Sequence, residues 1–247
     1  MGQWVAQHAA EALQQAISVN GDARLLIATG SSQFEVLDAL SKRDDVPWAN
    51  VTGFHLDEYI GLSPEHPASF CGYLKERFVD RVPLKEFLYL RGDEDAEATI
   101  RKACGKIAQH PAGRPPIDVA LVGIGENGHL AFNDPPADFL CEDAYIRVKL
   151  DEACRNQQVG EGWFASLSEV PEFAISMSIR QIMKCSKIFC SVPDERKAEA
   201  VKNSVEGKVT PDVPASILQQ HPDMTLIIDV AAASRLSTQT IQSAERL

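Results

Sequence analysis

The sequence Ile117-Asp118-Val119-Ala120-Leu121-Val122 is an apolar run, broken only by its aspartate, that ends in a glycine turn. A short apolar run bounded by a turn predicts a buried β-strand. Leu25-Leu26-Ile27-Ala28 has the same character and ends in Thr29-Gly30-Ser31-Ser32, after which residues 34–40 have helical spacing. Both segments therefore predict a strand that leads through a polar turn into the next element.

The rest of the chain continues this alternation of strands and helices. We expect further strands at 51–56, 144–149, 187–191 and 225–229. We expect helices at 4–17, 69–78, 93–109, 194–204 and 214–220. This order favours a doubly wound, mostly parallel α/β sheet with helices on both faces. No linker or repeat divides the sequence, so residues 1–247 are expected to form a single domain.

Composition and charge argue against several classes of protein. The 247 residues carry a formal net charge of −11. Phosphate backbones and anionic lipid surfaces attract basic proteins, so we expect neither nucleic acid nor a membrane as a partner. No apolar run reaches the ~20 residues of a membrane span, and the N-terminus lacks the features of a signal peptide. These observations favour a cytoplasmic protein.

The cysteines contain no C-x-x-C pair, so their spacing predicts neither a zinc site nor a disulfide framework.

In parallel α/β sheets, ligands bind beyond the carboxyl ends of the strands. The segment Thr29-Gly30-Ser31 places hydroxyl groups and a glycine before a helix, which suits an anion. An ordinary glycine turn with a helix cap accounts for the same residues. After the strand at 51–56, Asp57 and Glu58 point to different faces, so that one of them can enter a cleft and act as a base. An exposed acidic turn is the alternative.

Residues 123–136 contain the G-x-G-x-x-G spacing of dinucleotide-binding proteins. That site needs a helix that begins at the third glycine, and Asn133-Asp134-Pro135-Pro136 prevents one. We instead expect the turn to present His129 at the cleft, with Asp134 as the carboxylate that orients its imidazole. Lys197, at the start of a later helix, is within reach of a phosphate, although an exposed helical lysine has the same pattern.

Together, these segments resemble the glucosamine-6-phosphate deaminase/isomerase family. The resemblance runs in order through nearly the whole chain, and its most specific parts are Asp57-Glu58-Tyr59-Ile60-Gly61-Leu62 and the Gly-x-Asn-Gly-His-x-x-Phe-Asn segment at 125–133. It implies a parallel α/β fold and the conversion of glucosamine 6-phosphate and water to fructose 6-phosphate and ammonia. It implies no metal and no redox cofactor, and a small-molecule sugar phosphate as the partner.

The resemblance also implies roles for single residues. Asp57 matches the base that moves a proton between C2 and C1 of the open-chain sugar, and His129 matches the group that opens the ring. Asp134 stands where the family usually has the Glu that partners this histidine, and Asn127 stands where members carry Asp or Asn. The phosphate-binding residues that it implies are Thr29, Gly30, Ser31 and Lys197.

Two departures from the family pattern put the substrate in question. Asp134 is one methylene shorter than the usual Glu, so either His129 shifts or a water lies between them. Gln157-Gln158 stands where well-known members carry a phosphate-binding Arg, and a Gln cannot supply that charge. Arg155 is nearby and could substitute. Another amino-sugar phosphate, such as galactosamine 6-phosphate, is therefore an alternative substrate.

Two other functions remain open from the sequence. One is 6-phosphogluconolactonase, a hydrolase of the same superfamily, although the segment at 125–133 and the Asp57-Glu58-Tyr59 segment favour the deaminase. The other is a sugar-phosphate sensor that has lost catalysis. Family members differ in assembly, and the short chain favours a monomer or a small homo-oligomer.

Overall fold

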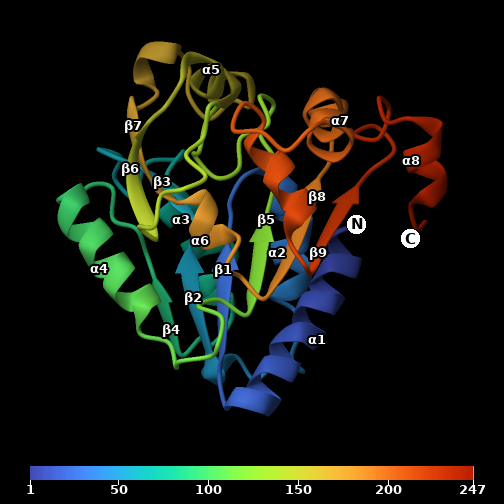
Figure 1. Cartoon of the computed structure of the whole chain (residues 1–247). Helices are drawn as coiled ribbons and strands as arrows, with labels where there is room; N and C mark the ends of the chain where they lie inside the picture. Colours follow the sequence, from blue (N-terminus) through green and yellow to red (C-terminus); the bar gives the residue numbers. More distant parts are fainter. Residues whose placement is uncertain (247) are drawn as a thin grey trace.

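A six-stranded parallel sheet forms the centre of the computed structural model, which describes residues 1–246 (Figure 1). In sheet order its strands are β4 (Glu86–Leu88), β2 (Val51–His55), β1 (Ala23–Ile27), β5 (Val119–Val122), β8 (Lys187–Val192) and β9 (Met224–Ile228). From β1 the chain builds the sheet outward through β2 and β4, and it then returns to β5 and builds the other half. Strands β1 and β5 therefore flank the point where the winding reverses, which is where such sheets bind ligands.

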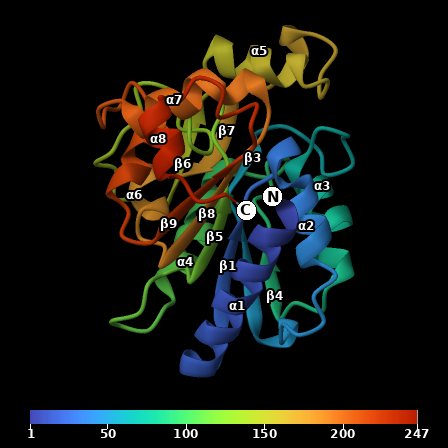
Figure 2. The same cartoon turned by 90° about the vertical axis from the view of Figure 1, so that its right-hand side faces the viewer.

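The strand residues alternate between two buried faces. Leu25 and Ile27 of β1 belong to one hydrophobic cluster, whereas Leu26 belongs to the cluster on the opposite face. Both faces are buried because helices cover them (Figure 2). On one face lie α1 (Gly2–Asn20), α2 (Phe34–Leu40) and α3 (Phe70–Arg77). On the other lie α4 (Ala96–Ala108), α6 (Ile179–Ile182) and α7 (Ala198–Glu206). The prediction of a doubly wound, mostly parallel sheet with helices on both faces is confirmed.

A second sheet of three antiparallel strands lies beside the first. Its order is β3 (Asp57–Tyr59), β7 (Phe173–Met177) and β6 (Tyr145–Lys149). The strand expected at 144–149 is therefore present, but it belongs to this small sheet. Its side chains alternate between buried and exposed positions, which is typical of a sheet with one face exposed to solvent. Strand β3 spans only three residues and follows β2 directly, so it carries no periodic signal of its own.

Several element ends differ from the expectations. Asp95 caps α4, so this helix begins later than the expected residue 93. The segment Pro214–Gln220 is a 3₁₀ helix instead of an α-helix. Helix α5 (Glu152–Gly160) and helix α8 (Thr238–Ser243) were not predicted, because both are polar and short. Within residues 1–246, no helix is both long and apolar enough to cross a membrane.

Candidate functional site

A cleft lies beyond the carboxyl ends of β1, β2, β5 and β8. In Figure 1 the arrows of β2 and β5 point toward this edge of the sheet, and α5 lies above it. Each of these four strands supplies part of the lining through the segment that follows it. The lining includes the predicted residues Thr29, Gly30, Ser31, Asp57, His129 and Lys197. Parallel strands thus bring together residues that lie far apart in the sequence.

The turn after β1 is fixed from two sides. Gly30 has a φ of 89°, a left-handed conformation that favours glycine. The hydroxyl of Tyr73, on α3, donates to the Gly30 carbonyl at 3.1 Å. The Gln33 amide donates to the Val122 carbonyl at 3.0 Å and ties this turn to β5. The three predicted anion-binding residues are therefore held in a turn that opens on the cleft.

Asp57 and Glu58 follow β2 and have different surroundings. Asp57 lines the cleft with its residue only 6% exposed, and burial together with the neighbouring Glu58 raises its pKa to about 8. Glu58 faces the start of α3, where it accepts hydrogen bonds from Ser69 Oγ and from the N–H groups of Phe70 and Cys71. Burial raises the pKa of Glu58 to about 7, and these donors oppose the rise. Only Asp57 is placed to meet a ligand.

The glycine-rich turn after β5 positions His129. No helix follows Gly128, so the expectation that this is not a dinucleotide site agrees with the structure. A Cβ at Gly125 would overlap the imidazole ring of His129, so a glycine is needed where the ring packs on the backbone. Gly128 has a φ of 84°, which lets the chain turn back toward the cleft.

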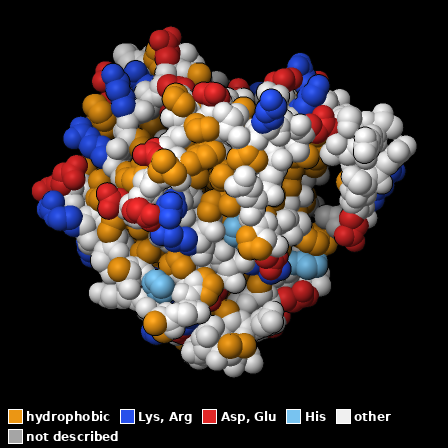
Figure 3. Space-filling view, in the orientation of Figure 1, with side chains coloured by type: hydrophobic (Ala, Val, Ile, Leu, Met, Phe, Trp, Pro, Cys, Tyr) orange, Lys and Arg blue, Asp and Glu red, His pale blue; other side chains and the backbone are white. Residues whose placement is uncertain are grey.

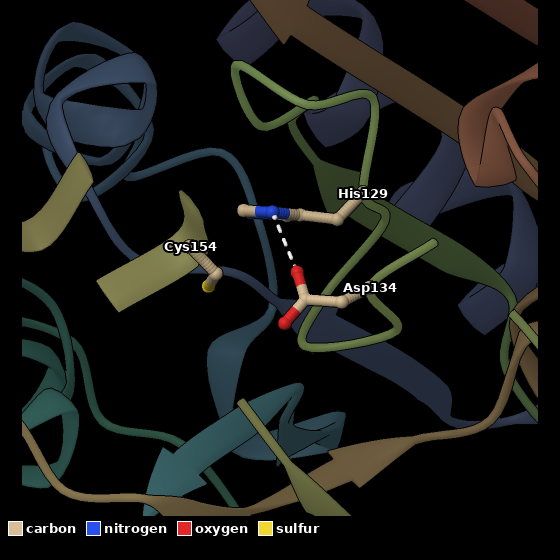
Figure 4. A group of neighbouring side chains, drawn as sticks. All are labelled: His129, Asp134 and Cys154. Atoms are coloured by element: carbon tan, nitrogen blue, oxygen red, sulfur yellow. Dashed lines mark ion pairs between the residues drawn. The ribbon is translucent and has the colours of Figure 1, made fainter. Parts of the chain in front are cut away.

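Asp134 and Asn127 lie behind the imidazole and not in the cleft lining. Nδ1 of His129 is 3.2 Å from Oδ1 of Asp134 (Figure 4). The shorter aspartate therefore contacts the imidazole directly, but the two groups are not aligned as a hydrogen bond. Asn127 connects them, because its Oδ1 accepts from the His129 N–H at 3.0 Å and its Nδ2 donates to Asp134 at 3.2 Å. Burial alone would raise the pKa of Asp134, but His129 and the N–H donors hold it below its usual value.

Lys197 has a partner that the sequence did not predict. Its side chain is 9% exposed, and Nζ lies 3.5 Å from Oε1 of Glu161. Glu161 follows α5 and is held by Gln157 Nε2 at 2.8 Å and Trp163 Nε1 at 3.3 Å. Burial lowers the pKa of Lys197 against the opposing effect of Glu161. The polar segment at 157–163 carries no periodicity that would indicate this contact.

Two backbone features mark the cleft as a functional region. Among the described residues, Ala131 and Asp194 are the non-glycine residues with positive φ, at 54° and 85°. Both line the cleft. Strained backbone of this kind clusters at binding and catalytic sites.

Arg155 does not take the place of the missing arginine. Its Nη2 donates to the carbonyls of Leu167 at 2.7 Å and Val170 at 2.9 Å, and its side chain does not line the cleft. The expectation that Arg155 could substitute is therefore wrong. Arg196, which precedes Lys197, lines the cleft instead and pairs with Asp194 at 2.9 Å.

Comparison with known proteins shows the family of this chain. The family model for glucosamine-6-phosphate isomerases/6-phosphogluconolactonase matches residues 1–227. A glucosamine-6-phosphate deaminase of Lacticaseibacillus paracasei is 38% identical over 88% of this chain and 89% of its own length. One from Streptococcus pneumoniae is 37% identical over the same shares.

Solved structures show the same relationship. A monomeric glucosamine-6-phosphate deaminase superposes with a TM-score of 0.82 at 31% identity, over 95% of this chain and 96% of that one. A 6-phosphogluconolactonase from Trypanosoma brucei has a TM-score of 0.75 at 14% identity, over 96% of each chain, and at this identity it shows the fold alone.

Proposed function

Because this chain belongs to the family of glucosamine-6-phosphate isomerases and 6-phosphogluconolactonases, we propose that it is a glucosamine-6-phosphate deaminase. It converts glucosamine 6-phosphate and water to fructose 6-phosphate and ammonia, and it works in the cytoplasm. The observation that carries the proposal is a buried carboxylate, Asp57, and an imidazole, His129, that line one cleft with the Thr29-Gly30-Ser31 turn and Lys197.

His129 opens the sugar ring. Ring opening moves a proton from the anomeric hydroxyl to the ring oxygen, and an imidazole can both accept and donate this proton. Asp134 and Asn127 are positioning residues that hold the ring and the backbone of His129.

Asp57 then transfers a proton between carbon atoms. In the open-chain aldehyde the C2 proton is acidic, since the adjacent carbonyl stabilises the negative charge that its removal creates. The Asp57 carboxylate takes this proton from C2 and returns it to C1. The C1 oxygen gains a proton and the amine at C2 loses one, so the nitrogen is left as an imine, which water hydrolyses to the ketone and ammonia. A positioned base of this kind contributes about 10²–10⁴-fold to the rate.

The phosphate end of the cleft supplies binding energy. Lys197, Arg196 and the turn at 29–31 offer positive charge and N–H groups to the phosphate. The phosphate does not react, so its binding serves to hold C1 and C2 against Asp57 and His129.

Ammonia release from glucosamine 6-phosphate tests the proposal. It is measured beside release from galactosamine 6-phosphate and hydrolysis of 6-phosphogluconolactone, for wild type, Asp57→Asn and His129→Gln. We expect ammonia from the first substrate and a loss of at least about 100-fold in both variants. Lactone hydrolysis that survives Asp57→Asn, without ammonia release, would move the protein to the lactonases. If only galactosamine 6-phosphate is converted, the proposed substrate is wrong and the proposed reaction type is retained.

A further inference from the structure

Cys154 faces the imidazole of His129 and the carboxylate of Asp134 (Figure 4). It lies in the first turn of α5, and the residue is 1% exposed. One ligand atom from each of the three residues lies within 4.8 Å of the other two. Nδ1 of His129 is fully buried and has no hydrogen-bond partner among the described residues. Three side chains thus bring metal-binding atoms together, and His129 Nδ1 makes no aligned hydrogen bond, although it lies 3.2 Å from Asp134 Oδ1.

The donor set fits a thiophilic divalent cation. Sulfur, nitrogen and carboxylate oxygen are the ligands of zinc in proteins, at about 2.0–2.3 Å. In a tetrahedral arrangement these bond lengths separate the ligand atoms by about 3.5 Å. The nitrogen and oxygen already lie 3.2 Å apart. The widest separation, at most 4.8 Å, needs to shorten by about 1 Å, which small changes of side-chain torsion provide.

The surroundings hold the ligands in place. Asp134 accepts hydrogen bonds from Asn127 Nδ2 at 3.2 Å and from the Asp151 N–H at 3.0 Å. Asp151 caps α5 by accepting from the Cys154 N–H, which orients the start of the helix. Such outer contacts raise the affinity of metal sites, because they fix the ligands before the metal binds.

We propose that His129 Nδ1, the Asp134 carboxylate and Cys154 Sγ form a binding site for Zn²⁺ or a similar thiophilic divalent cation. On binding, zinc loses water molecules, a zinc–sulfur bond forms and the thiol releases its proton to solvent. The thiolate and the carboxylate then balance the two positive charges. His129 also lines the cleft, so the fourth position is left to a water molecule.

Zinc at this site inhibits the enzyme, a consequence that rests on the proposed function. His129 cannot orient on Asp134 and move protons while its Nδ1 binds a metal. The spacing of the cysteines gave no sign of this site, because its ligands come from one turn and one distant helix and involve a single cysteine.

Binding is tested on the protein without substrate, so the result does not depend on turnover. Co²⁺ serves as an optical probe, since a thiolate ligand gives a charge-transfer band, and Zn²⁺ affinity is measured by competition with a chromophoric chelator. We expect one ion per chain in wild type. We expect the Cys154→Ser and Cys154→Ala variants to lose the band and to bind Zn²⁺ at least about tenfold more weakly. The control is Cys141→Ser, at a cysteine that is not part of this group of ligand atoms, and it should bind as wild type does.

Enzyme activity provides an independent test of the metal site. Zn²⁺ should inhibit wild type and Cys141→Ser, a chelator should restore activity, and Cys154→Ser should keep basal activity while losing most of the inhibition. The proposal is overturned if wild type binds no ion, or if the cobalt band survives in both Cys154 variants. If the protein binds the metal ion but has no deaminase activity, the proposed function is contradicted and the proposed metal site is still supported.

Discussion

At the scale of single residues, Asp57 and Glu58 show how neighbouring carboxylates acquire different properties. Their side chains point to opposite sides of β3, so Asp57 faces the cleft and Glu58 faces the N–H groups at the start of α3. From the residues alone, the sequence predicted that one of the two could enter a cleft, and the family resemblance pointed to Asp57. It could not predict the hydrogen bonds of Glu58 with Ser69 and Phe70, because these partners lie eleven and twelve residues further on.

Replacing Asp57 with Asn should stabilise the protein more at pH 8 than at pH 4. The native pKa of about 8 lies above the ordinary value of 3.8. A raised pKa gives stability that is fully present below pH 4 and is lost as the pH rises through about 8. A tenfold difference in proton affinity between the folded and the unfolded protein corresponds to ~1.4 kcal/mol. Urea unfolding of both proteins at the two pH values measures the difference.

The exposed Asp143 provides the control for this comparison. Asp143→Asn should change the free energy of unfolding by a similar, small amount at both pH values. A pH-independent effect of Asp57→Asn would contradict the raised pKa.

Asp134 should be replaceable by Glu but not by Asn. The carboxylate at 3.2 Å from His129 Nδ1 favours the tautomer with the proton on Nδ1 and stabilises the positive charge that the ring gains when it accepts a proton. We expect Asp134→Asn to lower kcat about 100-fold with little change in KM, since the group does not line the cleft. Asp134→Glu, which has the side chain usual in the family, should keep at least a tenth of kcat. Equal losses in the two variants would argue for a purely steric role.

At the scale of elements, the parts that sequence predicts are those with their own periodic signal. Strands β1 and β5 contain the apolar runs 25–27 and 119–122, and their burial on both faces of the main sheet explains these runs. Strands β3 and β7 and helix α5 form through contacts with distant segments, so no local pattern announces them. The contact of Glu161 with Lys197 was missed for the same reason, because it joins the end of α5 to the turn after β8.

From this contact we predict that Glu161 competes with the substrate for Lys197. In the structure its carboxylate lies 3.5 Å from Lys197 Nζ, where a phosphate would need to bind. Glu161→Gln removes a negative charge from a buried position, so we expect KM for the sugar phosphate to fall about 3–10-fold with kcat little changed. Steady-state kinetics on Glu161→Gln, with Glu152→Gln at the exposed start of α5 as the matched control, measures this. A rise in KM would mean that Glu161 binds the substrate instead.

At the scale of the whole molecule, the sheet explains why one chain can hold the entire site. Strands β1, β2, β5 and β8 lie side by side and in parallel, so the segments after them meet at one edge. Predicting parallel strands was therefore enough to predict that the cleft lies beyond their carboxyl ends. Helices cover both faces of the sheet, and α5 lies above this edge (Figures 1 and 2).

We expect the protein to act as a monomer. Asp57, His129 and Lys197 of the same chain line the cleft together. In the described part of the chain, the large exposed hydrophobic residues come from four separate segments, at Val19, Leu140, Val230 and Ile241. On the face shown in Figure 3, acidic and basic side chains are interspersed. The net charge of −11 adds a long-range repulsion between copies.

Light scattering during gel filtration should therefore give a mass near 27.1 kDa. The specific activity should also stay constant when the enzyme is diluted about 1000-fold from micromolar concentration, because a site formed within one chain does not dissociate. Raising the salt concentration weakens the repulsion between copies, so the mass should be measured at low and at high salt. A multiple of the monomer mass in both, with activity that falls on dilution, would show that an interface supports the cleft from outside. Helix α5 and the Glu161 that follows it would then be the first segment to examine, since Glu161 contacts Lys197 at the phosphate end.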